Sequence, residues 1–362
     1  MRWYCLATDA SAPGGVDTPY ASVDLERVDR NIQRMQNYCD AHRLALRPHV
    51  KTHKLPAIAH RQIHAGAVGV TCQKITEAEA MVAAGIENVL VAYPLLGAAK
   101  LERLCGLARQ SKISTAADSS NVARQMSAAV SARGLEVDFL VECDTGLGRT
   151  GVQSPGEARE LALLVDQLPG LRFAGLMTYP TGPQTPVLLQ AARAAIEAAG
   201  LPVDCVSGGG TETAFSTHES GVITELRVGT YVYGDRACIA NGSVSLEDCA
   251  LLIHATVVSR PTSDRAILDA GSKTLTTDPA EAPGVEGYGL IRERPLAQID
   301  ELFEEHARVR LSANEPPLEI GDMVSIVPNH ACGTTNMQNE VVIHRNGRMV
   351  GWWPVAARGA VR

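Results

Sequence analysis

The feature that most constrains the fold is a regular alternation of apolar runs and helix-like segments between residues 44 and 235. Near-continuous apolar strands joined by crossover helices indicate a parallel sheet that is buried on both faces. Eight such units predict an α/β fold with a closed, TIM-like (β/α)8 barrel. A doubly wound open sheet is the alternative, because periodicity does not distinguish an open sheet from a closed one. The eight runs are 44–50, 66–72, 87–93, 111–117, 137–143, 171–177, 203–209 and 224–230.

The pattern changes after about residue 245. Runs typical of β-strands follow, and the sequence RNG within the last of them is a hairpin turn signal. These runs predict a second, mostly antiparallel β domain. We expect the barrel at 25–245, with its entry helix at 25–42, and the β domain at 246–362 together with an N-terminal strand segment at 1–24.

Composition excludes several classes of protein. The 362 residues are 45% hydrophobic and 20% charged, as in an ordinary soluble protein of two domains. The net charge is −7 and no basic stripe occurs, which argues against a nucleic acid partner. No apolar run approaches the ~18 residues of a membrane span, and the first residues lack the apolar core of a signal peptide. We therefore expect no membrane partner and a cytoplasmic location, with the nine cysteines reduced.

Basic side chains gather where the first run ends, in LRPHVKTHK. Pro48 excludes a helix interior there, so the stretch reads as a strand that ends in a basic loop. Functional groups of such barrels lie at the carboxyl ends of the strands. Close to Arg47, His49 and Lys54, the neutral amine of Lys51 is favoured and is nucleophilic toward an aldehyde. The alternative is a phosphate-contacting or solvated lysine.

A glycine-rich turn, SGGGTET, follows the seventh run. Its backbone N–H groups suit a phosphate, and barrel phosphate sites favour the loops after strands seven and eight. The alternative is a turn without a ligand. The residues predicted to form the cradle are Ser207, Gly208, Gly209, Gly210 and Thr211.

A third motif, VPNHACGTTN, lies in the predicted β domain. His330 and Cys332 stand at i and i+2, so on an extended chain they face the same side. Imidazole and thiolate together suit Zn²⁺, and two protein ligands leave positions for water or substrate. A histidine and a cysteine buried in a turn are the alternative.

Taken together, the motifs resemble a known family. RPHVKTHK, GVTCQKITEAEAMVAAGI, LVECDTGLGRTGV, SGGGTET, ILDAG and VPNHAC occur in this order over nearly the whole chain. They resemble the D-threonine aldolase and D-serine dehydratase group, pyridoxal 5'-phosphate enzymes of the alanine-racemase-like fold. The resemblance implies a homodimer that acts on a small amino-acid substrate with pyridoxal 5'-phosphate and a divalent metal, Zn²⁺ or Mn²⁺.

The resemblance also implies roles for individual residues. Lys51 matches the cofactor lysine, Arg149 the arginine near the pyridine nitrogen, and Tyr179 an active-site tyrosine. Gly208 to Thr211 and Tyr231 match the phosphate-binding region, and His330 with Cys332 the metal-binding pair. Aldolases carry a histidine just after the tyrosine, where this chain has Pro180, so His49 and His53 are the candidates to replace that histidine, with His49 assigned as the catalytic group.

The implied activity is that of a lyase dependent on pyridoxal phosphate and a divalent metal, acting on D-configured β-hydroxy amino acids. CQKITEAEAMVAAGI, GLGRTGV and GGGT are similar to the aldolase branch, which gives glycine and an aldehyde. Cys332 is similar to the dehydratases, which give a keto acid and ammonia, whereas aldolases have an aspartate there. We expect the aldolase activity, with the dehydratase as alternative. A racemase or a non-catalytic pyridoxal-phosphate protein would leave the metal pair without a use.

Overall fold

The computed structural model describes residues 16–280, 282 and 284–362. Most of the expected N-terminal segment 1–24, with Cys5, lies outside the described residues. The chain divides into two compact units, which we call the barrel unit and the β unit. Among the described residues, the barrel unit comprises 33–51, 56–229 and 360–362, and the β unit comprises 16–32, 52–55, 230–280, 282 and 284–359. The domain boundary expected at residue 245 stays a prediction.

The barrel unit contains eight parallel strands in the order β2-β9-β8-β7-β6-β5-β4-β3. A parallel bridge between His49 and Thr71 joins the two ends of this order, and the Thr71 N–H donates to the Pro48 carbonyl at 2.7 Å. The sheet is therefore closed, which confirms the TIM-like barrel and excludes the open sheet. The strands are β2 (Ala45–Leu46), β3 (Val70–Cys72), β4 (Asn88–Val91), β5 (Lys112–Ala117), β6 (Val137–Glu142), β7 (Leu171–Met177), β8 (Cys205–Gly208) and β9 (Glu225–Leu226).

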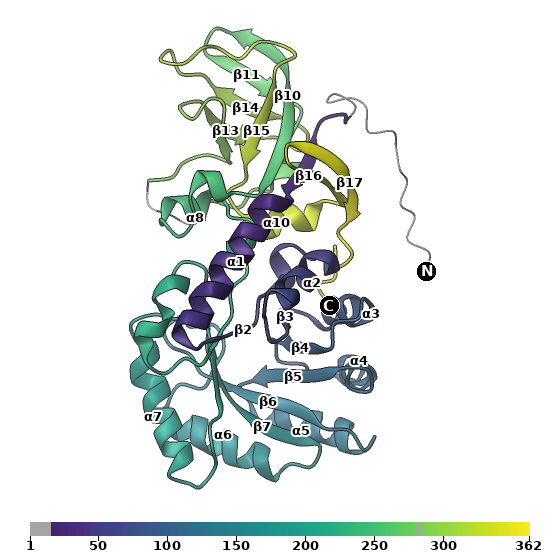
Figure 1. The fold of residues 1–362 in the computed structure, drawn as a ribbon, viewed down its shortest axis with the longest axis vertical. Helices are drawn as coiled ribbons and strands as arrows, with labels where there is room; N and C mark the ends of the chain where they lie inside the picture. The colour runs from purple at the N-terminus through teal and green to yellow at the C-terminus, as the bar shows by residue number, and fades with distance from the viewer. Residues whose placement is uncertain (1–15, 281, 283) are drawn as a thin grey trace. The chain divides into compact units, whose positions relative to one another are not determined.

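Amphipathic helices alternate with these strands in the chain (Figure 1). In α6, buried residues recur at the spacing of one helix face, at Ala158, Leu161, Ala162 and Val165. The helix begins with Pro155 after Ser154, whose hydroxyl accepts the Glu157 N–H, a typical start signal. The helices are α2 (Pro56–His64), α3 (Ile75–Ala83), α4 (Ala98–Ala108), α5 (Ser120–Ser131), α6 (Pro155–Gln167) and α7 (Thr185–Glu197); α1 (Leu25–His42) is shared between the two units.

The β unit is built on a largely antiparallel sheet in the order β11-β14-β13-β12-β15-β10-β1-β16-β17. β10 also pairs with β11, so six of the strands close into a second barrel, to which β1, β16 and β17 are added. This confirms the predicted second domain and the hairpin between β16 and β17. The strands are β1 (Tyr20–Asp24), β10 (Leu251–Thr262), β11 (Arg265–Leu268), β12 (Leu290–Ile291), β13 (Gln298–Leu302), β14 (Ala307–Arg310), β15 (Met323–Val327), β16 (Glu340–Arg345) and β17 (Arg348–Pro354).

No apolar run in the sequence predicted β12, β13 and β14. β13 and β14 alternate apolar and charged residues: Ile299 and Val309 are fully buried, whereas Asp300 and Arg308 form an outward ion pair at 2.8 Å. Their apolar residues are too few to form a visible run. No helix among the described residues is long and apolar enough to cross a bilayer.

A buried histidine lies inside the β unit. The His254 ring in β10 stacks on Tyr20, with ring centroids 4.6 Å apart, and its Nε2 lies 2.7 Å from the Ser22 hydroxyl. The residue is only 9% exposed. Burial, followed by the nearby His344, lowers the pKa of His254 to about 4. The folded protein therefore keeps this imidazole neutral in mildly acidic solution.

This burial predicts acid sensitivity of the fold. Between pH 6.5 and about pH 4, His254 is protonated in the unfolded chain and neutral in the folded chain. Because the unfolded state binds the extra proton, the free energy of unfolding falls as the pH falls. Relative to His254→Gln, we expect the wild type to lose up to about 3 kcal/mol over this interval. Chemical denaturation at several pH values measures the difference.

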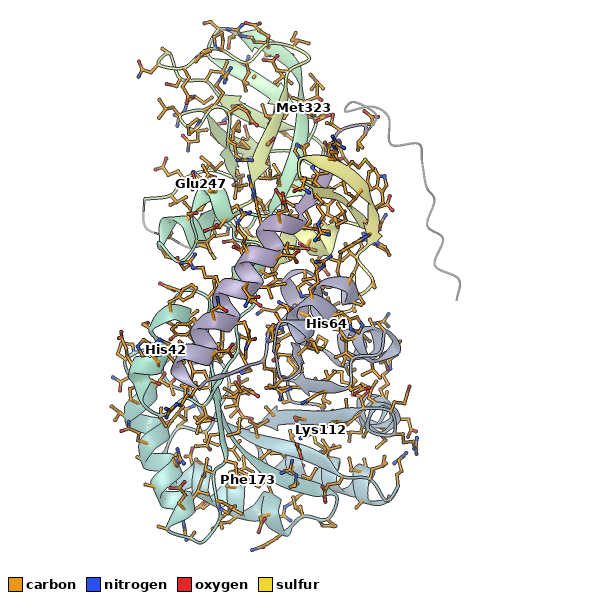
Figure 2. The ribbon with its side chains drawn as sticks, viewed as in Figure 1. His42, His64, Lys112, Phe173, Glu247 and Met323 are labelled. Atoms are coloured by element: carbon orange, nitrogen blue, oxygen red, sulfur yellow. The ribbon has the colours of Figure 1, made fainter. Side chains whose placement is uncertain are left out.

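His64→Gln is the matched control, because His64 is exposed at the end of α2 (Figure 2). It should follow the pH dependence of the wild type. A difference in the free energy of unfolding between wild type and His254→Gln that does not change with pH would contradict the prediction.

Candidate active site

Lys51 lies directly after the first barrel strand. It is half-buried in a short 3₁₀ turn, Val50–Thr52, that follows β2. Its backbone N–H donates to His49 Nδ1 at 3.3 Å, and His49 Nε2 lies 3.0 Å from Gln73 Oε1. Because Nδ1 accepts, Nε2 is the protonated nitrogen and donates to Gln73. These contacts make His49 a support for the turn that carries Lys51, and its catalytic role stays a prediction.

Three residues expected at the site meet around one aromatic ring. Lys51 Nζ lies 5.6 Å from the centroid of the Tyr179 ring, and Arg149 Cζ lies 5.4 Å from it. Arg149 comes from the loop after β6 and Tyr179 from the loop after β7, both at carboxyl strand ends. The Tyr179 side chain remains partly open to solvent. The barrel therefore brings together an amine, a phenol and a guanidinium from distant parts of the chain.

The loop that carries Arg149 is fixed from within. The Asp144 carboxylate accepts the N–H groups of Gly146 and Gly148 at 2.9 and 3.0 Å. These bonds lower the pKa of Asp144 below its usual range, because they favour the charged form. Asp144, one of the polar residues at this strand end, thus shapes the loop with its own carboxylate.

The glycine loop after β8 is shaped so that side chains do not fit. A Cβ on Gly209 would lie 2.0 Å from the Arg227 carbonyl oxygen, and one on Gly208 would lie 2.6 Å from Ile223 Cδ1. The position of a Cβ on Gly210 is 4.0 Å from the Tyr179 ring. Within the described part of the chain, the N–H groups of Gly209, Gly210 and Thr211 have no protein acceptor. The loop therefore presents free donors beside Tyr179, as a bound phosphate requires.

A buried charged network lies beneath this loop, and sequence reasoning missed it. Arg227 Nε donates to the Ser207 hydroxyl at 2.9 Å, and that hydroxyl donates to Glu225 Oε1 at 2.7 Å. The other Glu225 oxygen pairs with Arg47 at 2.7 Å. Burial lowers the pKa of Arg227, and the neighbouring Glu225 opposes this effect. The sequence TELRVGT indicates such a network, because the charged residues Glu225 and Arg227 interrupt a run that is expected to be buried.

The network has two consequences for the predicted site residues. Arg227 Nη2 also donates to the Thr178 carbonyl, so one guanidinium holds the strand end before Tyr179 and the glycine loop together. The Ser207 hydroxyl is engaged in the network.

Tyr231, expected in the phosphate region, lies buried in the β unit, in the 3₁₀ turn Thr230–Val232. Its phosphate role stays a prediction.

The predicted metal pair lies in the β unit, and one expectation about it was wrong. His330 is the N-cap of a short helix, α10 (Ala331–Met337), and Cys332 lies in the first turn of that helix. The two side chains are therefore brought together by a helix start and not by extended chain. Asp235 fixes this start by accepting the Ala331 N–H at 3.0 Å. The helix was missed because Gly and Thr favour it weakly.

The donor chemistry around His330 and Cys332 fits a divalent cation. A hydrogen bond to Cys332 raises the pKa of His330 to about 9, and the Asp278 carboxylate, 2.8 Å from Nδ1, adds to this while burial opposes it. Cys332 Sγ also lies 3.2 Å from the Thr52 hydroxyl. A cation would take the place of the proton shared by imidazole and thiol. Among the described residues no group of three or more His, Cys, Asp or Glu is arranged for a metal. A cation bound by His330 and Cys332 alone would keep open positions for water or substrate.

The chain matches two domain families and several characterised relatives. Residues 23–237 match "Alanine racemase, N-terminal domain", and residues 250–344 match "Putative serine dehydratase domain". The chain is 38% identical to the D-threonine aldolase of an Arthrobacter species, over 96% of this chain and 94% of that protein. It is 33% identical to the D-threo-3-hydroxyaspartate dehydratase of Delftia sp. strain HT23, over 88% of this chain and 92% of that protein.

A solved structure extends this similarity to the fold. The crystal structure of D-threonine aldolase from Filomicrobium marinum has a TM-score of 0.86 and 36% identity, and the match covers 96% of this chain and 97% of that one. The chain therefore belongs to the alanine racemase N-terminal domain family and, within that family, to the group of D-threonine aldolase and its relatives.

Proposed function

We propose that the protein is a lyase that uses pyridoxal phosphate and a divalent metal to cleave D-configured β-hydroxy amino acids between Cα and Cβ, giving glycine and an aldehyde. The observation that carries the proposal is the convergence of Lys51 and Arg149 on Tyr179, beside the glycine loop. The identity of 38% to a D-threonine aldolase over nearly the whole chain supports the choice of reaction.

In this proposal the barrel unit holds the cofactor. Lys51 would bond to its aldehyde carbon, the free N–H groups at Gly209, Gly210 and Thr211 would bind its phosphate, and Arg149 would face its pyridine ring. Bound pyridoxal phosphate withdraws electrons from the substrate Cα. Tyr179 packs against the amine of Lys51 and keeps its phenol available for a proton. Because a guanidinium stays protonated, Arg149 would disfavour protonation of the pyridine nitrogen and so weaken the cofactor ring as an electron sink. The reaction would then depend more on the electrostatic effect of other groups, such as the metal.

The β unit would hold the metal. His330 and Cys332 would supply one nitrogen and one sulfur ligand, a set that suits Zn²⁺ and also admits Mn²⁺. A bound divalent cation lowers the pKa of a coordinated hydroxyl or makes hydroxide a better leaving group. The Thr52 hydroxyl, which contacts Cys332, helps to keep the thiol in place.

Dehydration to a keto acid and ammonia is the second candidate. Cys332 favours it, because the resemblance associates a cysteine at this position with dehydratases. The Delftia relative, a dehydratase at 33% identity, is consistent with it. Pro180, which follows Tyr179 where the aldolases carry a histidine, points the same way. We further propose, on the resemblance alone, a homodimer in the cytoplasm.

The cofactor lysine is tested by absorbance. Lys51→Ala should abolish activity and remove the visible absorbance of bound pyridoxal phosphate, because no amine remains to bond its aldehyde. Lys112→Ala, at a residue labelled in Figure 2, is the control, because its side chain is 61% exposed. A wild-type protein that binds no pyridoxal phosphate, or a Lys51→Ala variant that keeps its absorbance, would disprove the assignment.

The two reactions are separated by their products. With D-threonine we expect glycine and acetaldehyde in equal amounts, and with D-serine no accumulation of pyruvate. Product analysis by chromatography, with ammonia assayed in parallel, measures both. Pyruvate and ammonia from D-serine at the faster rate would replace the aldolase assignment by the dehydratase.

Metal removal tests the role of the β unit. Dialysis against a chelator should abolish turnover and leave the cofactor absorbance unchanged, because the cofactor and the metal have separate ligands. Adding Zn²⁺ or Mn²⁺ should restore turnover in the wild type but not in His330→Ala. Full activity after complete metal removal, checked by elemental analysis, would exclude the metal.

A further inference from the structure

We propose that Asp278 is a positioning residue of the metal centre: its carboxylate fixes the His330 ring so that Nε2 is presented to the cation together with the Cys332 sulfur. The inference rests on the proposed function, because it needs a cation at the His330 and Cys332 pair. It assigns a role to a carboxylate that lies outside every motif identified in the sequence.

The first support is the contact itself. Asp278 Oδ2 lies 2.8 Å from His330 Nδ1, the distance of a charge-assisted hydrogen bond. When Nδ1 donates its proton to a carboxylate, Nε2 is the nitrogen with a free lone pair, and the ring becomes a stronger ligand. A histidine without such a partner would rotate and would change tautomer.

The second support is that Asp278 is itself held in place. The Asp278 carbonyl accepts the side-chain N–H of Asn329 at 3.1 Å, and its backbone N–H donates to Thr276 at 3.3 Å. Asn329 is 2% exposed and also donates to the Gly287 carbonyl at 2.8 Å. Because Asn329 immediately precedes His330, one segment fixes the carboxylate and the imidazole at the same time.

The third support is a glycine that leaves room for the carboxylate. A Cβ on Gly333, in the first turn of α10, would lie 2.6 Å from Asp278 Oδ2. Any other residue there would displace the carboxylate from its position over this turn. The glycine lowers helix propensity, so its use is explained by the close approach of Asp278.

Stability alone does not account for this arrangement. The side chains of His330 and Asp278 are 46% and 44% exposed, and exposed ion pairs contribute little to the free energy of unfolding. What the contact between Asp278 and His330 does achieve is to orient the His330 ring as a metal ligand.

The test measures affinity for Co²⁺, a spectroscopic substitute for Zn²⁺, in the holoprotein by competition with a chromophoric chelator. Asp278→Ala should weaken Co²⁺ binding about 10- to 100-fold, as loss of such an orienting partner does in other metal sites. The thiolate-to-cobalt absorbance from Cys332 and the pyridoxal phosphate absorbance should persist. Asp278→Asn, which keeps the shape and loses the charge, should show a smaller loss. Asp264→Ala, an exposed carboxylate of the same unit, should bind as the wild type does.

Gly333→Ala gives a second test that leaves every donor atom in the protein. The added Cβ should displace Asp278 and weaken Co²⁺ binding, although alanine favours the helix. In the Asp278→Ala background the same change should have little further effect, because the two substitutions act through one contact. Equal, additive losses would mean that Gly333 acts by another route and would overturn this part of the inference.

Three outcomes separate the inference from the function on which it rests. If His330→Ala and Cys332→Ala bind Co²⁺ like the wild type, the proposed metal site itself is wrong. If these two variants lose binding and Asp278→Ala keeps wild-type affinity while remaining folded, only the positioning role is wrong. If the visible d–d spectrum of bound Co²⁺ changes in Asp278→Ala, the carboxylate is a direct ligand and the positioning role is replaced.

Discussion

The barrel unit depends on one buried network of charged groups, in which Arg227, Ser207, Glu225 and Arg47 follow one another through hydrogen bonds and ion pairs. A guanidinium out of water is unfavourable unless it is paired and fully hydrogen-bonded. Here the pairing partners are the strand ends themselves: Arg227 also binds the carbonyl before Tyr179. The network therefore fixes the relative position of the residues on which the proposed cofactor chemistry relies.

In the β unit, buried hydrogen bonds fix the segments that carry the proposed metal ligands. Two short segments that are far apart in the chain, one with Asp278 and one with His330, are joined by Asn329, whose buried amide bonds to two carbonyls. Asp235 holds the start of α10. A buried polar group whose hydrogen bonds are all made specifies a single local arrangement. Such an arrangement orients a metal ligand before the cation binds.

Most of the fold was predictable from patterns of residues close in sequence. All eight apolar runs became barrel strands, and the segment 25–42 became the expected helix, because burial on both faces and amphipathic spacing leave clear marks in a sequence. β13 and β14 were missed because they are short, exposed on one face and rich in charge. The first turn of α10 was taken for extended chain, because Gly and Thr favour the helix only weakly and the contacts that stabilise it come from elsewhere in the chain.

The sequence by itself determined the identity of the chemical groups: the amine at Lys51, the phenol at Tyr179, the glycine loop, and the imidazole and thiol at His330 and Cys332. Only the tertiary structure decided which of these groups meet and what holds them. Residues 49 and 71 close the barrel, Arg227 reaches Thr178 across a sequence separation of 49, and Asp278 reaches His330 across 52. Such pairs are set by strand order, closure and turn geometry, and these have no counterpart in the spacing of residues along the chain.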